Sequence, residues 1–123
     1  MAILPIYEFP HIMLRRRAKK VRKNDRSILR LADDMIDTMR QSRGVGLAAN
    51  QVGVLQRVIV IQLEEDEEPR TYINPEIVHR EGEREVEEAC LSVPGYTGII
   101  TRAIWVKFKG LDRESRVVRL HTD

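Results

Sequence analysis

The chain has one cysteine, no long apolar run and few aromatic residues, and each scarcity excludes a class of protein. Cys90 is the only cysteine among 123 residues, so no internal disulfide can form and nothing calls for an oxidising compartment. No run approaches the roughly 18 apolar residues that a membrane span requires. No basic region precedes an apolar stretch at the amino terminus, as a secretory signal would require. The sequence therefore predicts a cytoplasmic protein with no membrane segment.

Charge is nearly balanced in total but uneven along the chain. The net charge is +2, yet residues 15–23 (RRRAKKVRK) are strongly basic, whereas residues 64–69 (EEDEEP) and 81–88 (EGEREVEE) are acidic. Aromatic residues make up only 5% of the chain, and RNA-binding surfaces usually add exposed aromatic side chains or a recognisable module. The basic run is therefore interpreted first as a solvated face, with an RNA-associated module as the less favoured alternative.

Apolar periodicity predicts one helix in the first half of the chain. Residues 24–44 carry Ile28, Ala32, Met35 and Met39 at steps of three and four, which is typical of an amphipathic helix. Asn24 or Asp25 can cap its start, and Gly44 can end it. Residues 11–21 are expected to hold at most a short helical turn.

The second half of the chain has the patterns of strands. Residues 57–63 (RVIVIQL) predict a buried strand, and residues 71–78 and 84–91 predict two more, with a break near Glu81-Gly82. Residues 102–110 alternate between apolar and polar, and a turn over residues 110–113 leads to a strand at 115–120. A helix followed by strands at hairpin spacing predicts an α+β fold with antiparallel sheets packed around helices, in one domain spanning residues 1–123.

Two segments draw attention as candidate sites. The first is GVGLAANQVG (44–53), which lacks the ending of a phosphate-binding loop and follows a helix rather than a strand, so it fits no nucleotide-binding motif. Its simplest interpretation is a tight helix-to-strand connection in which Gln51 satisfies a buried backbone group. The second is EEACLSVPG (87–95), which holds Cys90 ahead of an expected Ser-Val-Pro-Gly turn.

The residues alone leave the role of Cys90 open. A single cysteine at a strand end is most often a small buried hydrophobe. A nucleophilic cysteine needs a neighbouring histidine, and a metal ligand needs at least two further donors. His11, His79 and His121 are far apart in the sequence, and none belongs to a recognisable motif.

Taken together, the two segments resemble the signatures of a known enzyme family. GVGLAANQ is similar to the first signature of peptide deformylases, a glycine-hydrophobic-glycine-hydrophobic-Ala-Ala-x-Gln pattern. EACLS is similar to their second signature, Glu-Gly-Cys-Leu-Ser, with Ala89 where the family usually has glycine. The flanking stretches QVGVLQRVIVI, YINPEIV, VPGYTGIITRA and VKFKGLD agree in the same order, so the resemblance extends from about Leu4 to Leu120.

The resemblance implies a function and a set of site residues. Peptide deformylases are cytoplasmic metal hydrolases that remove the N-formyl group from the first methionine of nascent proteins, so N-formylmethionyl peptides and a transient approach to the ribosome are implied. They hold one divalent metal ion, Fe²⁺ natively with Zn²⁺ or Ni²⁺ possible. Cys90 matches the thiolate ligand, and the Gln51 amide and the Leu91 backbone N–H match the oxyanion donors. Val45, Gly46 and Ala89 match residues that line the groove for an extended peptide.

One part of the family pattern is absent from these 123 residues. No His-Glu-x-x-His motif occurs in them, and in the family this motif supplies two metal ligands and the general base from a carboxyl-terminal helix. We therefore expect a chain truncated relative to the family, with little activity, a metal held poorly or lost, and an uncovered apolar face. The alternative is a non-catalytic deformylase-like protein that binds peptides or forms a homodimer through that face.

Overall fold

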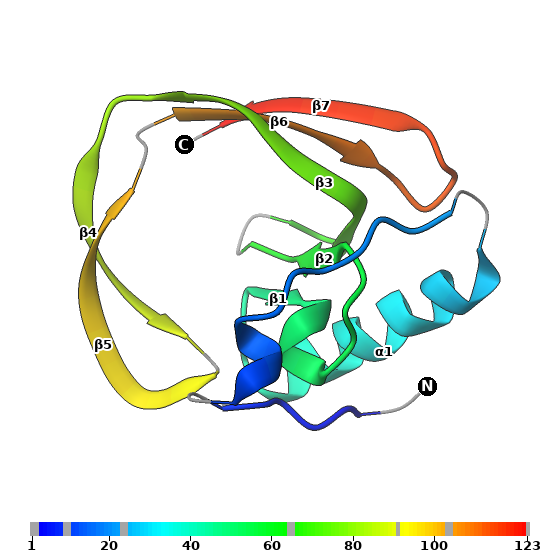
Figure 1. Ribbon diagram of the computed structural model, residues 1–123, viewed down its shortest axis with the longest axis horizontal. Helices are drawn as coiled ribbons and strands as arrows, with labels where there is room; N and C mark the ends of the chain where they lie inside the picture. Colours follow the sequence, from blue (N-terminus) through cyan, green and yellow to red (C-terminus); the bar gives the residue numbers. More distant parts are fainter. Residues whose placement is uncertain are drawn as a thin grey trace.

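In the computed structural model, one helix packs on a five-stranded antiparallel sheet, and a second, two-stranded sheet extends from it (Figure 1). The structure describes residues 3–8, 11–22, 25–63, 66–90, 92–102 and 105–122, with the backbone alone for 86–90, 93–102, 105 and 120–122. The larger sheet has the order β1-β2-β3-β6-β7, and β4 pairs with β5. The elements are η1 (Ile12–Leu14), α1 (Arg26–Gln41), β1 (Gly46–Ala48), η2 (Ala49–Val52), β2 (Val58–Ile61), β3 (Arg70–Glu81), β4 (Arg84–Cys90), β5 (Val93–Arg102), β6 (Trp105–Leu111) and β7 (Val117–Thr122). The predicted α+β fold with antiparallel sheets is confirmed.

Helix α1 lies within the predicted range, although its carboxyl-terminal end differs in detail. Asp25 caps the helix, and hydrogen bonds from the side chain and backbone of Ser27 hold the pKa of the Asp25 carboxyl below its usual value. At the other end Arg43, rather than the expected Gly44, adopts the left-handed conformation, with φ of 57°. The Gly44 N–H still donates to the carbonyl of Met39 at 2.9 Å, which satisfies one of the last free carbonyls of the helix.

The core lies between α1 and the first strands of the large sheet. Helix α1 packs on β1 and β2, and the predicted stripe from Ile28 to Met39 faces this contact. Strand β2 buries alternate residues, so that Val58 and Val60 are 1% and 0% exposed. Within the described residues, the buried hydrophobic side chains are Ile28, Ala32, Met35, Ile36, Met39, Leu47, Ala49, Val52, Val58, Val60, Tyr72 and Ile73. No helix in the same part of the chain is long and apolar enough to cross a membrane.

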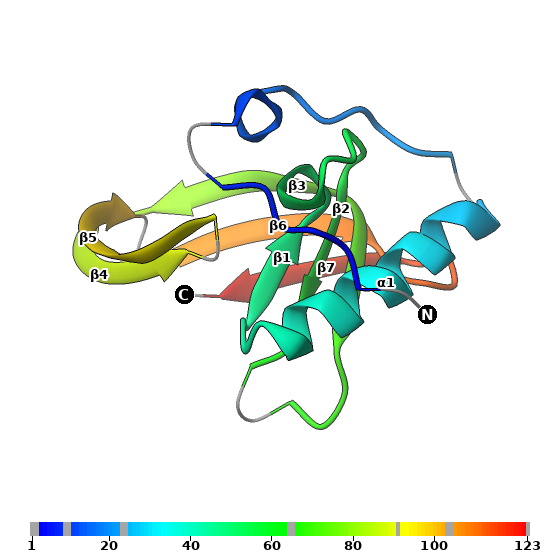
Figure 2. The same ribbon diagram turned by 90° about the horizontal axis from the view of Figure 1, so that it is seen from below.

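The predicted strands are present, but they divide between two sheets. Strand β3 pairs with β2 and β6, and the chain then leaves this sheet at the predicted break, so that β4 pairs with β5 instead. Figure 2 shows the β4–β5 pair projecting to one side of the larger sheet. Strand β6 alternates as predicted, with Lys107 and Lys109 exposed and Phe108 in edge contact with Tyr72 at 5.2 Å between ring centroids. The last turn lies slightly later than expected, around Asp112, which accepts hydrogen bonds from the Glu114 and Arg116 N–H groups.

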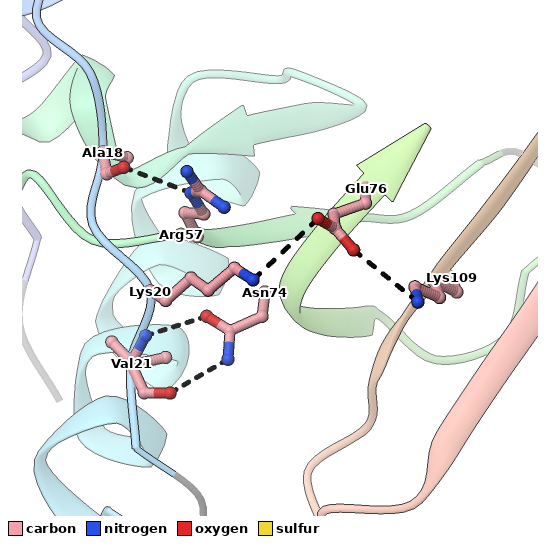
Figure 3. Close-up of polar contacts among 7 residues, drawn as sticks. All are labelled: Ala18, Lys20, Val21, Arg57, Asn74, Glu76 and Lys109. Atoms are coloured by element: carbon pink, nitrogen blue, oxygen red, sulfur yellow. Dashed lines mark hydrogen bonds and ion pairs between the residues drawn. The ribbon is translucent and has the colours of Figure 1, made fainter. Parts of the chain in front are cut away.

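Residues 15–22, here called the basic strap, run along the start of β2. Lys19 forms a parallel bridge with Gln56, and Arg57 donates from its Nε to the carbonyl of Ala18 at 3.1 Å (Figure 3). Asn74 clamps the next residues, because its side-chain amide accepts from the Val21 N–H at 2.8 Å and donates to the Val21 carbonyl at 2.9 Å. A segment with almost no regular secondary structure is therefore held firmly against the sheet.

Replacing Thr71 by valine is expected to raise the free energy of unfolding by about 1 kcal/mol, because a buried hydroxyl without a partner is costly. Thr71 is 5% exposed, and its Oγ1 has no hydrogen-bond partner within the described structure. The matched control is Thr38→Val. Thr38 is 1% exposed, but its hydroxyl accepts from the Leu4 N–H and donates to the Asp34 carbonyl.

The control substitution is expected to lower the free energy of unfolding by about 1–2 kcal/mol, because both hydrogen bonds are lost. Urea unfolding of the two variants beside the parent chain measures both changes. A loss of stability at Thr71 equal to the loss at Thr38 would contradict the assignment of an unsatisfied hydroxyl.

Candidate active site

The first signature forms a short edge strand and a tight turn. Strand β1 pairs with β2 and is the first strand in the order of the larger sheet. The turn η2 follows at once, and its Ala49 and Val52 are 0% and 6% exposed, which anchors the turn in the core. Gly53 ends the turn at φ of 81°, a conformation that glycine adopts without steric cost. The predicted helix-to-strand connection is confirmed, and it also contains the edge strand β1, which was not predicted.

The side-chain amide of Gln51 bridges the two signatures. Its Oε1 accepts a hydrogen bond from the Ala48 N–H at 3.0 Å, and its Nε2 donates to the Oγ of Ser92 at 3.1 Å. The first contact confirms that Gln51 satisfies a backbone group of its own turn. Because a backbone N–H can only donate, this contact also determines which end of the amide is oxygen and directs the Nε2 toward the β4–β5 hairpin.

The second signature occupies the end of that hairpin. Strand β4 ends at Cys90, which stands opposite Val93, the first residue of β5. The expected Ser-Val-Pro-Gly turn is wrong, because residues 93–95 already belong to a strand and the reversal comes earlier. Ser92 is 4% exposed and faces Gln51. Leu91 lies outside the described residues, as do the side chains of Ala89 and Cys90, so their predicted roles stay predictions.

The predicted groove residues of the first signature lie at the open edge of β1. Val45 is 61% exposed, and its carbonyl accepts from the Gln62 N–H at 2.9 Å. A methyl group added at Gly46 would meet only the Val60 carbonyl, at the ordinary contact distance of 3.7 Å. Packing within the described chain therefore does not require glycine at position 46. Because Gly46 has no side chain, its backbone on this edge strand is left uncovered. An extended peptide can pair with a surface of this kind.

The described residues do not complete a metal site. No cluster of three or more His, Cys, Asp or Glu side chains occurs among them. His11 caps η1 by accepting from the Met13 N–H and stacks near Tyr7, whereas His79 contacts Glu81 at 3.1 Å on β3. The side chain of His121 is outside the described part. A metal held by Cys90 would need at least two further donors, and the described residues contain no complete ligand set.

Two residues beside Gln51 were not recognised from the sequence. Ser92 is part of the quoted second signature, yet only the folded hairpin shows its contact with the Gln51 amide. Tyr7 donates its backbone N–H to the Gln51 carbonyl at 2.7 Å, and its ring covers Gly53. The signal for Ser92 was its place in the signature. Tyr7 had no local signal, because its contacts join the start of the chain to the η2 turn.

Replacing Gly53 by alanine is expected to lower the free energy of unfolding by about 1–3 kcal/mol, from backbone strain and from displacement of the Tyr7 ring. A Cβ at this position would lie 2.6 Å from the Cε2 of Tyr7. The control is Gly82→Ala, since Gly82 is exposed and also has a positive φ, 65°.

The control separates the two causes, because Gly82→Ala carries the backbone cost without the ring of Tyr7. Urea unfolding of both variants is the measurement. Equal losses would show that the Tyr7 ring moves aside freely, and would contradict the packing role given to it here.

The sequence and the backbone of this chain are both similar to those of known proteins. The family model described as polypeptide deformylase matches residues 3–123. A peptide deformylase from Dehalococcoides mccartyi strain CBDB1 is 52% identical over 120 residues, which are 98% of this chain and 72% of that protein. A crystal structure of a peptide deformylase from Legionella pneumophila has a TM-score of 0.94 at 44% identity, covering 99% of this chain and 73% of the other. One from Ehrlichia chaffeensis, in complex with actinonin, also has a TM-score of 0.94, at 36% identity, covering 100% of this chain and 76% of that one.

These matches run through both signatures and through nearly the whole of the described fold. Identity well above 30% over almost all 123 residues, together with a shared backbone, leaves one family assignment. The chain belongs to the polypeptide deformylase family, whose members are hydrolases of protein biosynthesis.

Proposed function

We propose that this chain carries the oxyanion donors of a deformylase acting on N-formylmethionyl peptides. The main support for this proposal is the position of the Gln51 side-chain amide, which is hydrogen-bonded to both the Ala48 N–H and the Ser92 hydroxyl. An amide carbonyl develops negative charge on its oxygen when water adds to the carbon. A donor that is already oriented stabilises that charge without further reorganisation. In this proposal the Nε2 of Gln51 is one donor, and the backbone N–H of Leu91 is the second.

The peptide is proposed to lie in extended form along the open edge of β1. Support comes from the exposed Val45 and from Gly46, whose backbone has no side chain to shield it. Ala89 lines the opposite side of the same groove in this proposal. Backbone hydrogen bonds along an edge strand hold a peptide without selecting its side chains, so they suit a substrate class defined by its amino-terminal formyl group.

The proposed reaction is metal-dependent, and Cys90 would supply one thiolate ligand. The described residues do not fit the metal by themselves, because no cluster of three or more His, Cys, Asp or Glu side chains occurs among them, and the sequence contains no His-Glu-x-x-His motif. We therefore assign no step to the metal in this chain. The proposal is that residues 1–123 alone hold Fe²⁺, Zn²⁺ or Ni²⁺ poorly and have little activity, since a single thiolate cannot retain the ion.

The surroundings of the enzyme form part of the same proposal. Residues 1–123 act as a single domain in the cytoplasm, and close to the ribosome during translation, because the substrates are nascent chains. A homodimer through apolar surface is supported by Ile77, Val78 and Val117, which are 56%, 55% and 59% exposed. Sedimentation at several concentrations tests the dimer.

The function is tested by formate release from an N-formylmethionyl peptide under anaerobic conditions. Two proteins are compared: residues 1–123, and the same residues joined to a segment that carries a His-Glu-x-x-His helix. Activity confined to the joined protein supports the proposal. If the joined protein binds the peptide and a metal but releases no formate, the non-catalytic peptide-binding alternative replaces it.

A further inference from the structure

We propose that the basic strap, residues 15–22, binds the phosphate backbone of single-stranded RNA. The strap contacts η2 through the Asn50 side chain, which donates to the Arg16 carbonyl, but the proposal does not depend on deformylation. It rests on three properties of the strap: a fixed backbone, a row of exposed cations, and a hollow that these cations line.

The backbone of the strap is pre-organised by hydrogen bonds to three other segments. The Lys19 N–H donates to the Leu55 carbonyl at 3.0 Å, and the Arg57 N–H donates to the Lys19 carbonyl at 2.9 Å. The Asn50 side chain donates to the Arg16 carbonyl at 2.8 Å. With the Asn74 clamp on Val21 (Figure 3), these bonds span the strap from residue 16 to residue 21. A ligand would therefore not have to order this backbone, which lowers the entropic cost of binding.

The basic side chains of the strap are exposed to solvent, whereas Val21 packs against the core. Arg16, Arg17 and Lys19 are exposed, and none of them forms an ion pair with another residue that the structure describes. Lys20 behaves differently, because it lies 4.0 Å from Glu76, which also approaches Lys109 (Figure 3). The binding charge is therefore assigned to Arg16, Arg17 and Lys19.

The same three cations line a surface hollow of about 700 Å³. Its other walls come from Met13 and from residues 53–56, and no acidic residue occurs among the lining residues. The apolar residues Val54 and Leu55 line this hollow together with Arg16 and Arg17. Such a lining suits a base and its flanking phosphates, because Arg combines bidentate phosphate contacts with stacking.

RNA, rather than an anionic membrane, is the partner that the side chains of the strap favour. Two of the three cations are arginines, whose guanidinium groups combine bidentate phosphate contacts with stacking on bases. Val21, the largest apolar side chain of the strap, packs against the core and does not form a face that could enter a headgroup region.

The test is fluorescence anisotropy of a short labelled oligouridylate with the 123-residue chain over about 50–200 mM salt. The triple variant Arg16→Gln, Arg17→Gln, Lys19→Gln is expected to bind at least about tenfold more weakly at the lowest salt. It is also expected to flatten the slope of log K against log salt by roughly 2, since each phosphate contact on a single strand contributes about 0.7.

The control is the triple variant Arg80→Gln, Lys107→Gln, Arg119→Gln, whose residues are exposed on β3, β6 and β7. Both triples remove three positive charges from the same net charge of +2, leaving 2 − 3 = −1. Circular dichroism checks that both remain folded. Equal weakening by the two triples, or no binding by the parent chain, overturns the proposal. So does strap-dependent binding to phosphatidylserine–phosphatidylcholine vesicles without binding to the oligonucleotide.

Discussion

Joining residues 1–123 to a segment that carries a His-Glu-x-x-His helix is expected to raise formate release by at least about 10⁴-fold over the chain alone. The general base by itself contributes typically 10²–10⁴, and a retained metal ion adds Lewis-acid chemistry to it. The same joining is expected to raise the bound metal from a small fraction to about one ion per chain. Metal analysis and the anaerobic formate assay check the two quantities separately.

The physical reason lies in the number of donors. Sites that retain a divalent metal for catalysis commonly use three protein ligands, and a lone thiolate loses the ion to solvent or to chelators. The present chain offers Cys90, with no cluster of further donors among the described residues. It spans 72% of the Dehalococcoides mccartyi relative, so a segment from the rest of that protein is a suitable source.

Two matched proteins make this prediction decisive. A joined protein whose added glutamate is replaced by glutamine keeps the metal but should lose most of the rate. A joined protein with Cys90→Ala should lose both metal and rate. If the Cys90→Ala protein retains a full complement of metal and activity, Cys90 is a packed thiol, and the metal-ligand assignment fails.

The helix and the strands could be predicted because their signals are local. The spacing of Ile28, Ala32 and Met35 specifies one buried helical face whatever it packs against, and the run VIVI specifies a strand. The division into two sheets could not be predicted. At Gly82 the chain turns away from β3 with a positive φ, and only the partners available in three dimensions decide that β4 pairs with β5.

Gln51 could be predicted as a residue of the candidate site, but the residues that hold it in place could not. Gln51 stood out as a polar residue after small ones, and its contact with the Ala48 N–H lies within one turn. Its contact with Ser92 spans 41 residues, and that with Tyr7 joins the chain's first residues to the same turn. Such supports depend on register and packing, which no local pattern encodes. The correct position of the hairpin reversal was missed for the same reason.

Replacing Gln51 by alanine in the joined protein is expected to lower kcat by about 10²–10³, with KM little changed. The substitution removes a donor that acts on charge present mainly in the transition state, so substrate binding is largely spared. Gln51→Glu should be as severe, because a carboxylate can still accept from the Ala48 N–H but has no proton to donate. Formate release at a series of peptide concentrations measures kcat and KM.

A second glutamine provides the matched control. Gln62 is half-buried, and its amide accepts from the Nε of Arg40 at 3.2 Å and donates to the Asp66 carbonyl at 3.4 Å. Gln62→Ala removes the same kind of side chain from the residue that follows β2, and it should leave kcat unchanged. Ser92→Ala is an intermediate case. It removes one neutral hydrogen bond that orients the Gln51 Nε2, and a loss of about three- to tenfold is expected.

The results for these variants, taken together, distinguish an oxyanion donor at Gln51 from a residue that only binds substrate or holds η2 in place. If Gln51→Ala raises KM and leaves kcat intact, the amide contributes uniform binding in the groove, and the oxyanion assignment is wrong. If Gln51→Glu retains activity while Gln51→Ala does not, the side chain acts by holding η2 through the Ala48 N–H. Only loss of kcat in both, with a smaller loss in Ser92→Ala, fits an oriented donor. That ordering follows from the geometry, because Ser92 contacts the amide from the hairpin, whereas the amide itself is proposed to contact the substrate.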